Sequence, residues 1–188
     1  NDLNKEFPKY NFSEFYKYDN PVENKKALNN WNNFPPTTYK VMSFLNSEYF
    51  VKHLSKLTKI NKLFSDIGLN GGGWHAMGNI GKLNPHLDYS IHPKLNLKRK
   101  LNLIIFLNKN WKKTWGGRTQ FYTHNKKDNT HREIFKEVIP KFNRALLFDT
   151  SQNSWHGVSK IKCPKKQYRK SLAIYFLTNK SSKTIKRK

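Results

Sequence analysis

The first third of the chain combines polar, proline-interrupted sequence with one stretch of helical periodicity. Residues 1–38 are polar, carry scattered aromatic residues and are interrupted by prolines, which is typical of a loop, with a short helix expected over residues 23–30. From residue 38 to residue 59 apolar residues recur at steps of three and four, the spacing of one face of an α-helix. This pattern predicts one amphipathic helix over residues 38–59.

Beyond Asn70-Gly71-Gly72-Gly73 the helical periodicity does not return strongly, and short apolar runs alternate with Gly, Pro, Asn and Lys clusters. Runs of this kind predict β-strands. The predicted strands cover residues 74–80, 101–107, 119–123, 137–139, 144–148, 154–158 and 171–178. A helical portion followed by this many short strands predicts a mainly β protein, a double-stranded β-helix (jelly roll) with N-terminal helices packed on one sheet.

Length and composition predict the domain organisation. A chain of 188 residues with 36% hydrophobic residues is suited to one compact core, so we expect a single domain over residues 1–180. Within it, residues 1–70 would form the loop and helix portion and residues 71–178 the jelly-roll core. The charged residues 179–188 lack an apolar anchor and predict a disordered basic tail.

Two absences in the sequence bear on location. No stretch approaches the ~18 consecutive apolar residues of a membrane span, and the first residues show no apolar signal core. Cys163 is the only cysteine, so no disulfide can form within the chain, which favours a reducing compartment. We therefore expect a cytoplasmic protein without membrane contact.

The chain is strongly basic, with 36 Lys and Arg against 12 Asp and Glu and a formal charge of +24. Such a balance is typical of proteins that bind polyanions, including nucleic acids. The lysines are nevertheless dispersed and mixed with Asn and Ile, which is also what AT-rich coding produces. A solvated basic surface is the favoured interpretation, and nucleic acid is the less favoured partner.

His86 and Asp88 are two residues apart, so in an extended chain their side chains point to the same side. An imidazole nitrogen and a carboxylate oxygen could then reach one metal ion, although a surface turn explains the pair alone at least as well. His156 follows much later, in a short apolar run after a predicted strand. Two His and one carboxylate on one face of an octahedron leave three positions open, which suits non-haem Fe(II) that binds a co-substrate and dioxygen together.

The last predicted strand alternates cleanly between an apolar face and a mixed face. Arg169 and Ser171 share the mixed face with the small Ala173. An Arg fork and a Ser hydroxyl beside the second His could grip one end of a dicarboxylate, and Ala173 would leave room for its chain. Taken alone, Arg169 is better explained as a solvated residue at a strand end. The order H-x-D, long gap, His, short gap, R-x-S is what makes the pattern specific.

In this order the motifs resemble the 2-oxoglutarate/Fe(II) oxygenase superfamily, and within it the prolyl-hydroxylase-like branch. The resembling stretch runs from about residue 73 to residue 177. Its motifs are His86-Leu87-Asp88-Tyr89, Leu101-Asn102-Leu103-Ile104-Ile105-Phe106-Leu107-Asn108, Trp111, Trp115-Gly116-Gly117, Phe148-Asp149, His156-Gly157-Val158 and Arg169-Lys170-Ser171. The resemblance implies a jelly-roll dioxygenase that hydroxylates an unactivated C–H bond and decarboxylates 2-oxoglutarate to succinate.

The resemblance also implies a role for each candidate residue. His86, Asp88 and His156 would hold Fe(II), and 2-oxoglutarate would chelate that iron through its C1 carboxylate and keto oxygen. The C5 carboxylate of 2-oxoglutarate would pair with Arg169, assisted by Ser171, and dioxygen would take the last metal position. Ascorbate would serve as a reductant.

Two positions depart from the prolyl-hydroxylase pattern. Many of those relatives anchor the C5 carboxylate with Lys and carry an acidic residue after Gly-Gly, where this chain has Arg169 and Arg118. Both departures count against proline as the substrate. We expect a small molecule or a peptide side chain, and a basic loop over residues 94–100 would favour an anionic one. An oxygenase acting on nucleobases would need aromatic stacking platforms and a basic groove near the site.

Several further residues carry weaker signals. Asn102 interrupts an apolar strand, and it would either donate to the co-substrate or be an ordinary hydrogen-bonded strand residue. Tyr89 and Tyr175 would either border the pocket or pack in the core, and His75 and His92 are expected to be structural or exposed. A different class of function also stays open, a non-catalytic, metal-containing, cupin-like binding module, although a structural metal is normally coordinated fully by protein.

Overall fold

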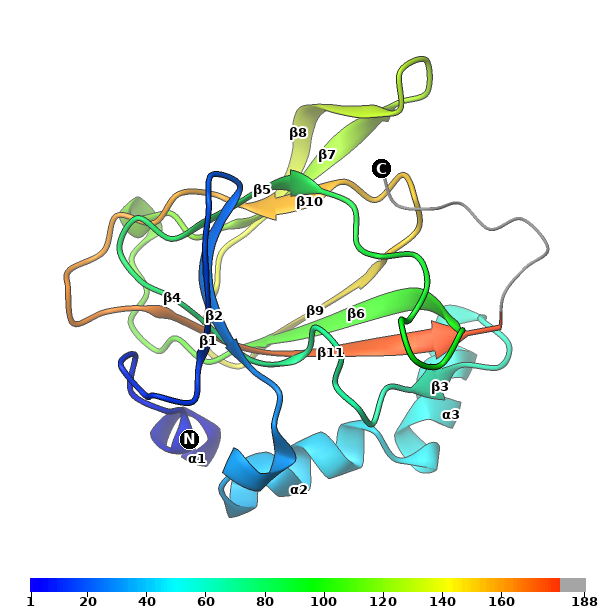
Figure 1. The fold of residues 1–188 in the computed structure, drawn as a ribbon, viewed down its shortest axis with the longest axis horizontal. Helices are drawn as coiled ribbons and strands as arrows, with labels where there is room; N and C mark the ends of the chain where they lie inside the picture. The colour runs from blue at the N-terminus through cyan, green and yellow to red at the C-terminus, as the bar shows by residue number, and fades with distance from the viewer. Residues whose placement is uncertain (180–188) are drawn as a thin grey trace.

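The computed structural model describes residues 1–179, and its elements are mainly strands (Figure 1). The helical segments are α1 (Asp2–Glu6), η1 (Trp31–Asn33), α2 (Pro36–Leu45), α3 (Glu48–Thr58) and η2 (Lys113–Trp115), of which η1 and η2 are 3-10 turns. The strands are β1 (Tyr16–Asp19), β2 (Glu23–Leu28), β3 (Phe64–Ser65), β4 (Gly73–Met77), β5 (Lys82–His86), β6 (Lys98–Phe106), β7 (Thr119–Asn125), β8 (Thr130–Val138), β9 (Arg144–Asp149), β10 (His156–Val158) and β11 (Arg169–Thr178). Within residues 1–179, no helix has the length and apolar character to cross a membrane.

The strands form one curled sheet whose pairings are antiparallel. Its main path runs β8-β7-β10-β5-β2-β4-β11-β6-β9, with β1 beside β2 and β3 beside β11. In Figure 1 the sheet folds over so that β5, β10 and β7 lie across from β4, β11, β6 and β9, and the β1–β2 hairpin crosses between the two layers. This curled half-barrel is a jelly roll, so the predicted fold class is confirmed.

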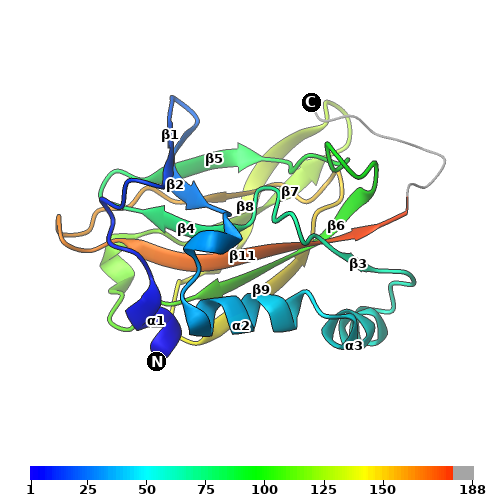
Figure 2. The same ribbon diagram turned by 60° about the horizontal axis from the view of Figure 1, so that its bottom comes forward.

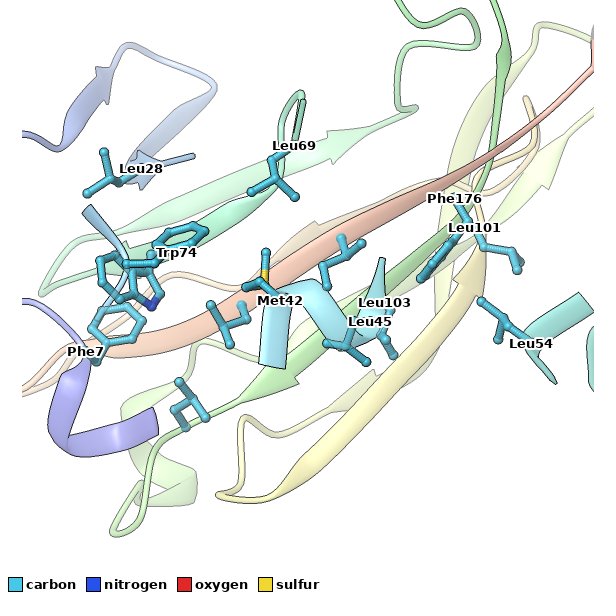
Figure 3. Packing of buried hydrophobic residues seen from close by; sticks show 14 of the residues in the cluster. Phe7, Leu28, Met42, Leu45, Leu54, Leu69, Trp74, Leu101, Leu103 and Phe176 are labelled. Carbon is cyan, nitrogen blue, oxygen red and sulfur yellow. The ribbon is translucent and has the colours of Figure 1, made fainter. Parts of the chain in front are cut away.

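Helices α2 and α3 cover the outer face of the layer that contains β11 and β6 (Figure 2). Their apolar sides meet the sheet in one continuous core, part of which is drawn in Figure 3. The buried residues of this core include Met42, Leu45, Leu54, Trp74, Leu101, Leu103, Leu172, Ile174 and Phe176. Burying one large apolar side chain is worth roughly 1.5–3 kcal/mol, so this interface holds β6 and β11 firmly in place.

Alternation along β11 gives its two faces different tasks. Leu172, Ile174 and Phe176 point into the helix-covered core, as the sequence predicts. Arg169 and Ser171 lie on the opposite face and line the hollow side of the curled sheet. One strand therefore supplies both the packing that positions the sheet and the polar groups inside it.

The single helix predicted over residues 38–59 is instead two helices, because capping residues interrupt a continuous apolar stripe. Asn46 ends α2, and its side-chain amide donates to the backbone oxygen of Met42 at 2.9 Å. Ser47 then begins α3, and its hydroxyl accepts from the backbone N–H of Phe50 at 3.2 Å. Side chains of this kind satisfy free backbone groups at helix ends, so the break costs little.

The helix predicted over residues 23–30 is wrong, because strand β2 occupies most of this segment. The Asn20 side chain accepts from the backbone N–H groups of Val22 and Glu23 and closes the turn from β1. Strand β2 then pairs with β1 on one edge and with β4 and β5 on the other. These long-range pairings outweigh the local preference of a Lys-rich segment.

Several other elements differ from the sequence prediction. Helix α1 and strands β1, β3 and β5 were not predicted, and β8 was predicted only at its end, over residues 137–139. Strand β8 is exposed along almost its whole length, so no alternation of burial marks it in the sequence. The predicted disordered tail over residues 179–188 lies outside the described residues, apart from Asn179.

Candidate active site

A cavity of about 720 Å³ opens between the two layers of the sheet. Its walls come from β1, β2, β4, β5, β6, β7, β10 and β11, so residues far apart in the sequence meet there. This volume lies in the range of sites that bind small molecules. Because the apolar faces of β6 and β11 are turned toward the helices, the polar groups of these strands face the cavity.

Two neighbouring strands bring the two histidines of the motif together. In the β5–β10 pair, His156 is the register partner of His86, and the two ring centroids are 4.3 Å apart. Asp88 follows two residues after His86, and the ligand atoms of the three residues all lie within 4.8 Å of one another. Gly157 permits this close pairing, because a Cβ there would lie 2.6 Å from the backbone oxygen of Leu83.

The backbone determines which nitrogen of each imidazole faces Asp88. Nδ1 of His86 lies 3.0 Å from the backbone oxygen of Asn84, and Nδ1 of His156 lies 2.9 Å from that of Ser154. A carbonyl oxygen only accepts, so Nδ1 carries a proton in both rings and Nε2 is the nitrogen that is left to bind a metal. Burial, and secondly the neighbouring His156, lowers the pKa of His86 to about 4, so this ring is neutral at pH 7.

Asp88 completes a set of atoms that fits a divalent metal. Its Oδ1 accepts from the Tyr175 hydroxyl at 3.0 Å, whereas its Oδ2 is buried without a hydrogen-bond partner among residues 1–179. Burial alone would raise the pKa of Asp88, but His156, His86 and Arg99 hold it below its usual value. The two Nε2 atoms lie 3.9 and 3.7 Å from this carboxylate. Two imidazole nitrogens and a carboxylate oxygen without a hydrogen-bond partner among residues 1–179 therefore converge, and two His with one carboxylate suit non-haem Fe(II).

Arg169 lies at the start of β11 in a pocket of neutral partners, with 3% of its surface exposed. Nε donates to the backbone oxygen of Gly117, NH1 to Oγ of Ser171 and NH2 to Oγ1 of Thr119, at 3.1, 3.2 and 3.1 Å. Burial lowers the pKa of Arg169 to about 10, so the guanidinium remains charged at pH 7. It forms no ion pair with any described carboxylate. A buried, unpaired charge is unfavourable, so this pocket is suited to an anion.

The hydrogen bonds of Arg169 also leave a defined place for that anion. A guanidinium has five N–H groups, and the three bonds above leave one N–H on each terminal nitrogen. Two such parallel donors match the two oxygens of a carboxylate. Ser171 was expected beside Arg169 from the sequence, whereas Thr119 was missed. The only available signal for Thr119 was its place at the start of a strand just after Gly116-Gly117.

Asn102 and Arg99, both on β6, also line the cavity. Asn102 is 4% exposed, and its Oδ1 has no hydrogen-bond partner within residues 1–179, so its role as a donor to the co-substrate stays a prediction. From the sequence, Arg99 was expected only as part of a basic loop over residues 94–100, and residues 98–100 instead belong to β6. Simple alternation puts it on the helix side with Leu101 and Leu103, but the register of β6 against β11 skips Lys100. This bulge turns the side chain of Arg99 to the cavity.

The remaining sequence candidates have different surroundings. His75 lines the cavity but is not part of the metal cluster, and burial lowers its pKa to about 3. His92 is buried away from the metal cluster, and its Nδ1 accepts from the backbone N–H groups of Lys94 and Leu95. Tyr89 is exposed at the cavity, and Tyr175 is buried in its wall.

A comparison with protein families gives a match that covers most of the strands that line the cavity. The model described as the 2OG-Fe(II) oxygenase superfamily matches residues 72–177. This segment contains the metal cluster, Arg169 and the strands from β4 to β11, apart from Thr178, the last residue of β11. The match favours the enzyme over the alternative of a non-catalytic metal-containing binding module.

Solved structures with a similar fold include several prolyl hydroxylases. A Pseudomonas putida prolyl-4-hydroxylase superposes with a TM-score of 0.53 at 14% identity, covering 89% of this chain and 79% of that chain. A Trichoplax adhaerens prolyl hydroxylase in complex with a hypoxia inducible factor peptide fragment gives a TM-score of 0.56 at 14% identity, covering 89% and 72%. The viral collagen prolyl hydroxylase of Paramecium Bursaria Chlorella virus-1, in a 2OG complex, gives 0.52 at 13%, covering 86% and 81%. At these identities the likeness concerns the fold.

Proposed function

Since this chain belongs to the 2OG-Fe(II) oxygenase superfamily and is a 2-oxoglutarate-dependent hydroxylase, we propose that His86, Asp88 and His156 hold its iron and that its substrate is a peptide side chain. The enzyme uses Fe(II), 2-oxoglutarate and dioxygen. When bound, these three supply C–H hydroxylation, in which one oxygen atom enters the substrate and the other enters 2-oxoglutarate, which leaves as succinate and CO2.

The observation that carries the assignment of the metal ligands is the arrangement around Asp88. Both Nδ1 atoms donate to backbone carbonyls, so both Nε2 atoms converge with a carboxylate oxygen that has no hydrogen-bond partner among residues 1–179. Backbone carbonyls are common second partners of metal-binding His, because they fix the tautomer and the ring orientation. The Tyr175 hydroxyl, which donates to Asp88, would orient the carboxylate in the same way.

We assign Arg169 to the C5 carboxylate of 2-oxoglutarate. Its two remaining terminal N–H groups would bind that carboxylate, and Ser171, which already accepts from Arg169, keeps its own hydroxyl hydrogen to donate. Asn102 would donate to the co-substrate from β6, the strand beside β11. The alternative cations are Lys160, Lys162, Lys165 and Lys166. All four are exposed in the loop before β11, where water screens their charge.

A peptide fits the opening of the cavity better than a small metabolite does. Tyr16, Tyr18 and Tyr89 line the cavity and are exposed, so a bound chain could pack against their rings. The Trichoplax adhaerens structure contains a peptide fragment, which supports the same class of substrate for this fold. The departures at Arg169 and Arg118 leave the hydroxylated residue type unassigned. Ascorbate would act as the external reductant.

We also propose that residues 1–180 act as one catalytic domain. Helices α2 and α3 share a continuous core with β6 and β11, the strands that carry Arg99, Asn102 and Arg169. Cutting the chain between residues 70 and 71 would expose this core, and we expect the isolated segment 71–178 to be insoluble or unfolded.

Succinate formation tests the proposed function. The purified chain, loaded with Fe(II) and supplied with 2-oxoglutarate, dioxygen and ascorbate, is assayed with degenerate peptide pools and with a panel of free amino acids. We expect peptides to stimulate succinate release, with a mass increase of one oxygen atom in the peptide. Stimulation by free amino acids alone would contradict the peptide assignment. Equal turnover by the Asp88→Ala variant would contradict the metal assignment.

A further inference from the structure

We infer that the cavity contains a second anion receptor, centred on Arg99, and that the peptide substrate presents a carboxylate side chain to it. This inference rests on the proposed function, because it names a group of the substrate bound at the same site. It starts from the fact that two buried arginines line one cavity, whereas 2-oxoglutarate has only one carboxylate to place away from the metal.

Arg99 is buried, and its hydrogen-bond partner is neutral. It is 3% exposed and forms no ion pair with any carboxylate of residues 1–179. NH2 donates to the backbone oxygen and to Oδ1 of Asn70, at 2.6 and 2.7 Å, and these two bonds occupy both of its N–H groups. Nε is buried without a hydrogen-bond partner, and NH1 makes no hydrogen bond to any described residue. The charge and the NH1 donors are therefore available to a ligand in the cavity.

A buried network holds Arg99 in this orientation. The backbone N–H of Asn70 donates to Oδ2 of the fully buried Asp66 at 2.9 Å. Oδ1 of Asp66 lies 3.3 Å from Nε2 of His92, whose other nitrogen is occupied by two backbone donors. Gly71, at a φ of 74°, keeps the space beside the guanidinium open, because a Cβ there would lie 3.1 Å from NH2 of Arg99. These buried groups fix the guanidinium on the side of Asn70, so its other side is oriented to bind an anion in the cavity.

Arg99 lies beside the metal cluster and far from Arg169. The guanidinium stacks on the ring of Tyr175 at 4.2 Å, and the hydroxyl of that ring donates to Asp88. Along β11 the partner of Arg99 is Leu177, eight residues from Arg169. At about 3.3 Å per residue this separates the two backbone positions by roughly 26 Å. A co-substrate bound at the metal and at Arg169 therefore leaves Arg99 for the substrate.

Charge balance points to an acidic group. The two positive charges of iron and that of Arg169 are matched by Asp88 and the two carboxylates of 2-oxoglutarate. Asp66, the buried carboxylate of the network that holds Arg99, contacts Asn70 and His92, so no carboxylate of residues 1–179 binds Arg99 directly. A carboxylate is the natural partner of a guanidinium and forms strong charge-assisted hydrogen bonds. The formal charge of +24 adds a long-range attraction for acidic peptides. The exposed tyrosines at the opening favour an acidic side chain of a peptide over a free small acid.

Equilibrium binding tests the receptor without turnover. The protein is loaded with Mn(II) and N-oxalylglycine, an unreactive analogue of 2-oxoglutarate, and titrated with labelled seven-residue peptide pools that are uncharged except for one fixed position. We expect the pool with fixed Glu to bind at least tenfold more tightly than the matched pool with fixed Gln. Arg99→Gln should remove most of this difference and Arg99→Lys should keep part of it. Arg132→Gln, the same change on the exposed strand β8, should keep all of it.

Each other outcome overturns a defined part of the inference. Equal binding of the Glu and Gln pools to the wild-type protein overturns the receptor, and this comparison needs no variant to fold. A tenfold loss of N-oxalylglycine binding in Arg99→Gln would make Arg99 the co-substrate anchor instead. Free N-acetylglutamate that displaces the Glu pool at a lower concentration than unlabelled pool would exclude the peptide as the source of the carboxylate. A Glu preference without succinate formation in the turnover assay would contradict the proposed function and leave the receptor standing.

Discussion

The two ends of the cavity hold arginines of equal exposure in different ways. At one end Arg169 is bonded by Gly117, Ser171 and Thr119, which come from two strands and a tight turn, so the guanidinium is fixed on three sides. At the other end Arg99 is bonded by Asn70 alone and rests on the ring of Tyr175. Both are 3% exposed.

This difference indicates two kinds of ligand. A charge fixed on three sides, with one N–H left on each terminal nitrogen, suits one invariant group presented in one geometry, as the C5 carboxylate of 2-oxoglutarate is. A charge bonded on one side and facing the part of the cavity lined by Tyr89 tolerates groups that arrive on different peptides. The metal cluster lies where both ligands must meet, and Tyr175 joins it to the Arg99 end.

Removing the metal site should have the largest effect and should affect both ends. We expect Asp88→Ala, His86→Ala and His156→Ala each to weaken Fe(II) or Mn(II) binding by more than ~100-fold, since loss of an outer partner of a ligand already costs ~10–100-fold. Anaerobic calorimetry measures the affinity, and circular dichroism checks the fold. Asp149→Ala is the matched control, because Asp149 pairs with Lys100 outside the cluster. Stoichiometric tight binding by any of the three would exclude that residue as a ligand.

Truncating Arg169 should separate the two ends. Leaving the partner of a buried charge pair without its counterpart typically costs ~2–5 kcal/mol in binding, so Arg169→Ala should raise the 2-oxoglutarate concentration for half-maximal turnover by more than about tenfold. Arg169→Lys should recover only part of the loss, because an ammonium has no two-pronged geometry. Metal affinity without co-substrate should barely change. Arg99→Gln is the contrast, and it should shift the 2-oxoglutarate dependence by less than about threefold.

His75 lies in the cavity wall near the positive charge of Arg169. We expect it to lower the stability of the metal-free protein at acidic pH. Burial lowers its pKa to about 3, against 6.5 for a free side chain. Below pH 6.5 the unfolded chain therefore binds a proton at His75 that the folded protein does not bind. The contribution of His75 to the free energy of unfolding is fully present above pH 6.5 and is lost as the pH falls toward 3. Because the ring is half-buried, we expect a loss of at most about 2 kcal/mol at pH 5 relative to pH 7.

Urea unfolding of metal-free protein at both pH values measures this loss. His75→Gln should reduce the difference between pH 7 and pH 5, while His86 keeps a share of it because its pKa is lowered in the same direction. An unchanged difference in His75→Gln would show that His75 is protonated as easily in the folded protein as in the unfolded chain.

The smallest effect is expected at Ser171. It accepts one hydrogen bond from Arg169 and would give one to the co-substrate, and a net hydrogen bond is worth ~0.5–1.5 kcal/mol. Ser171→Ala should therefore raise the 2-oxoglutarate concentration for half-maximal turnover by roughly two- to tenfold, less than Arg169→Ala. Thr178→Ala, at the far end of β11, serves as the control. A loss in Ser171→Ala as large as that in Arg169→Ala would mean that Ser171, and not Arg169, dominates the anchor.

The Arg169 end could be predicted from the sequence because it follows regular alternation. Period-two spacing puts Arg169 and Ser171 on one face of β11 and the core residues on the other, and the same rule aligns His86 with Asp88. Register between strands is not visible in this pattern, so the pairing of His86 with His156 needed the order of motifs to suggest it.

The Arg99 end could not be predicted from the sequence, because the period-two alternation that places Arg169 fails there. The bulge at Lys100 reverses alternation along β6, and the partner of Arg99 comes from the loop at Asn70, 29 residues earlier. Strand β2, which borders the same cavity, was predicted to be a helix because its partners lie far away in the sequence. The position of Arg99 depends on a single inserted residue in β6, and strand β2 depends on long-range pairing. Neither feature produces a local periodicity in the sequence.

A crystal structure with Mn(II) in place of iron and with 2-oxoglutarate bound would test the account most directly. We expect the metal on His86, Asp88 and His156, and the C5 carboxylate within ~2.7–3.2 Å of both terminal nitrogens of Arg169, the range of charge-assisted hydrogen bonds. NH1 of Arg99 should have no contact with the co-substrate. A C5 carboxylate bound to Arg99, or to a lysine of the loop before β11, would contradict the division of the cavity into two anion-binding ends.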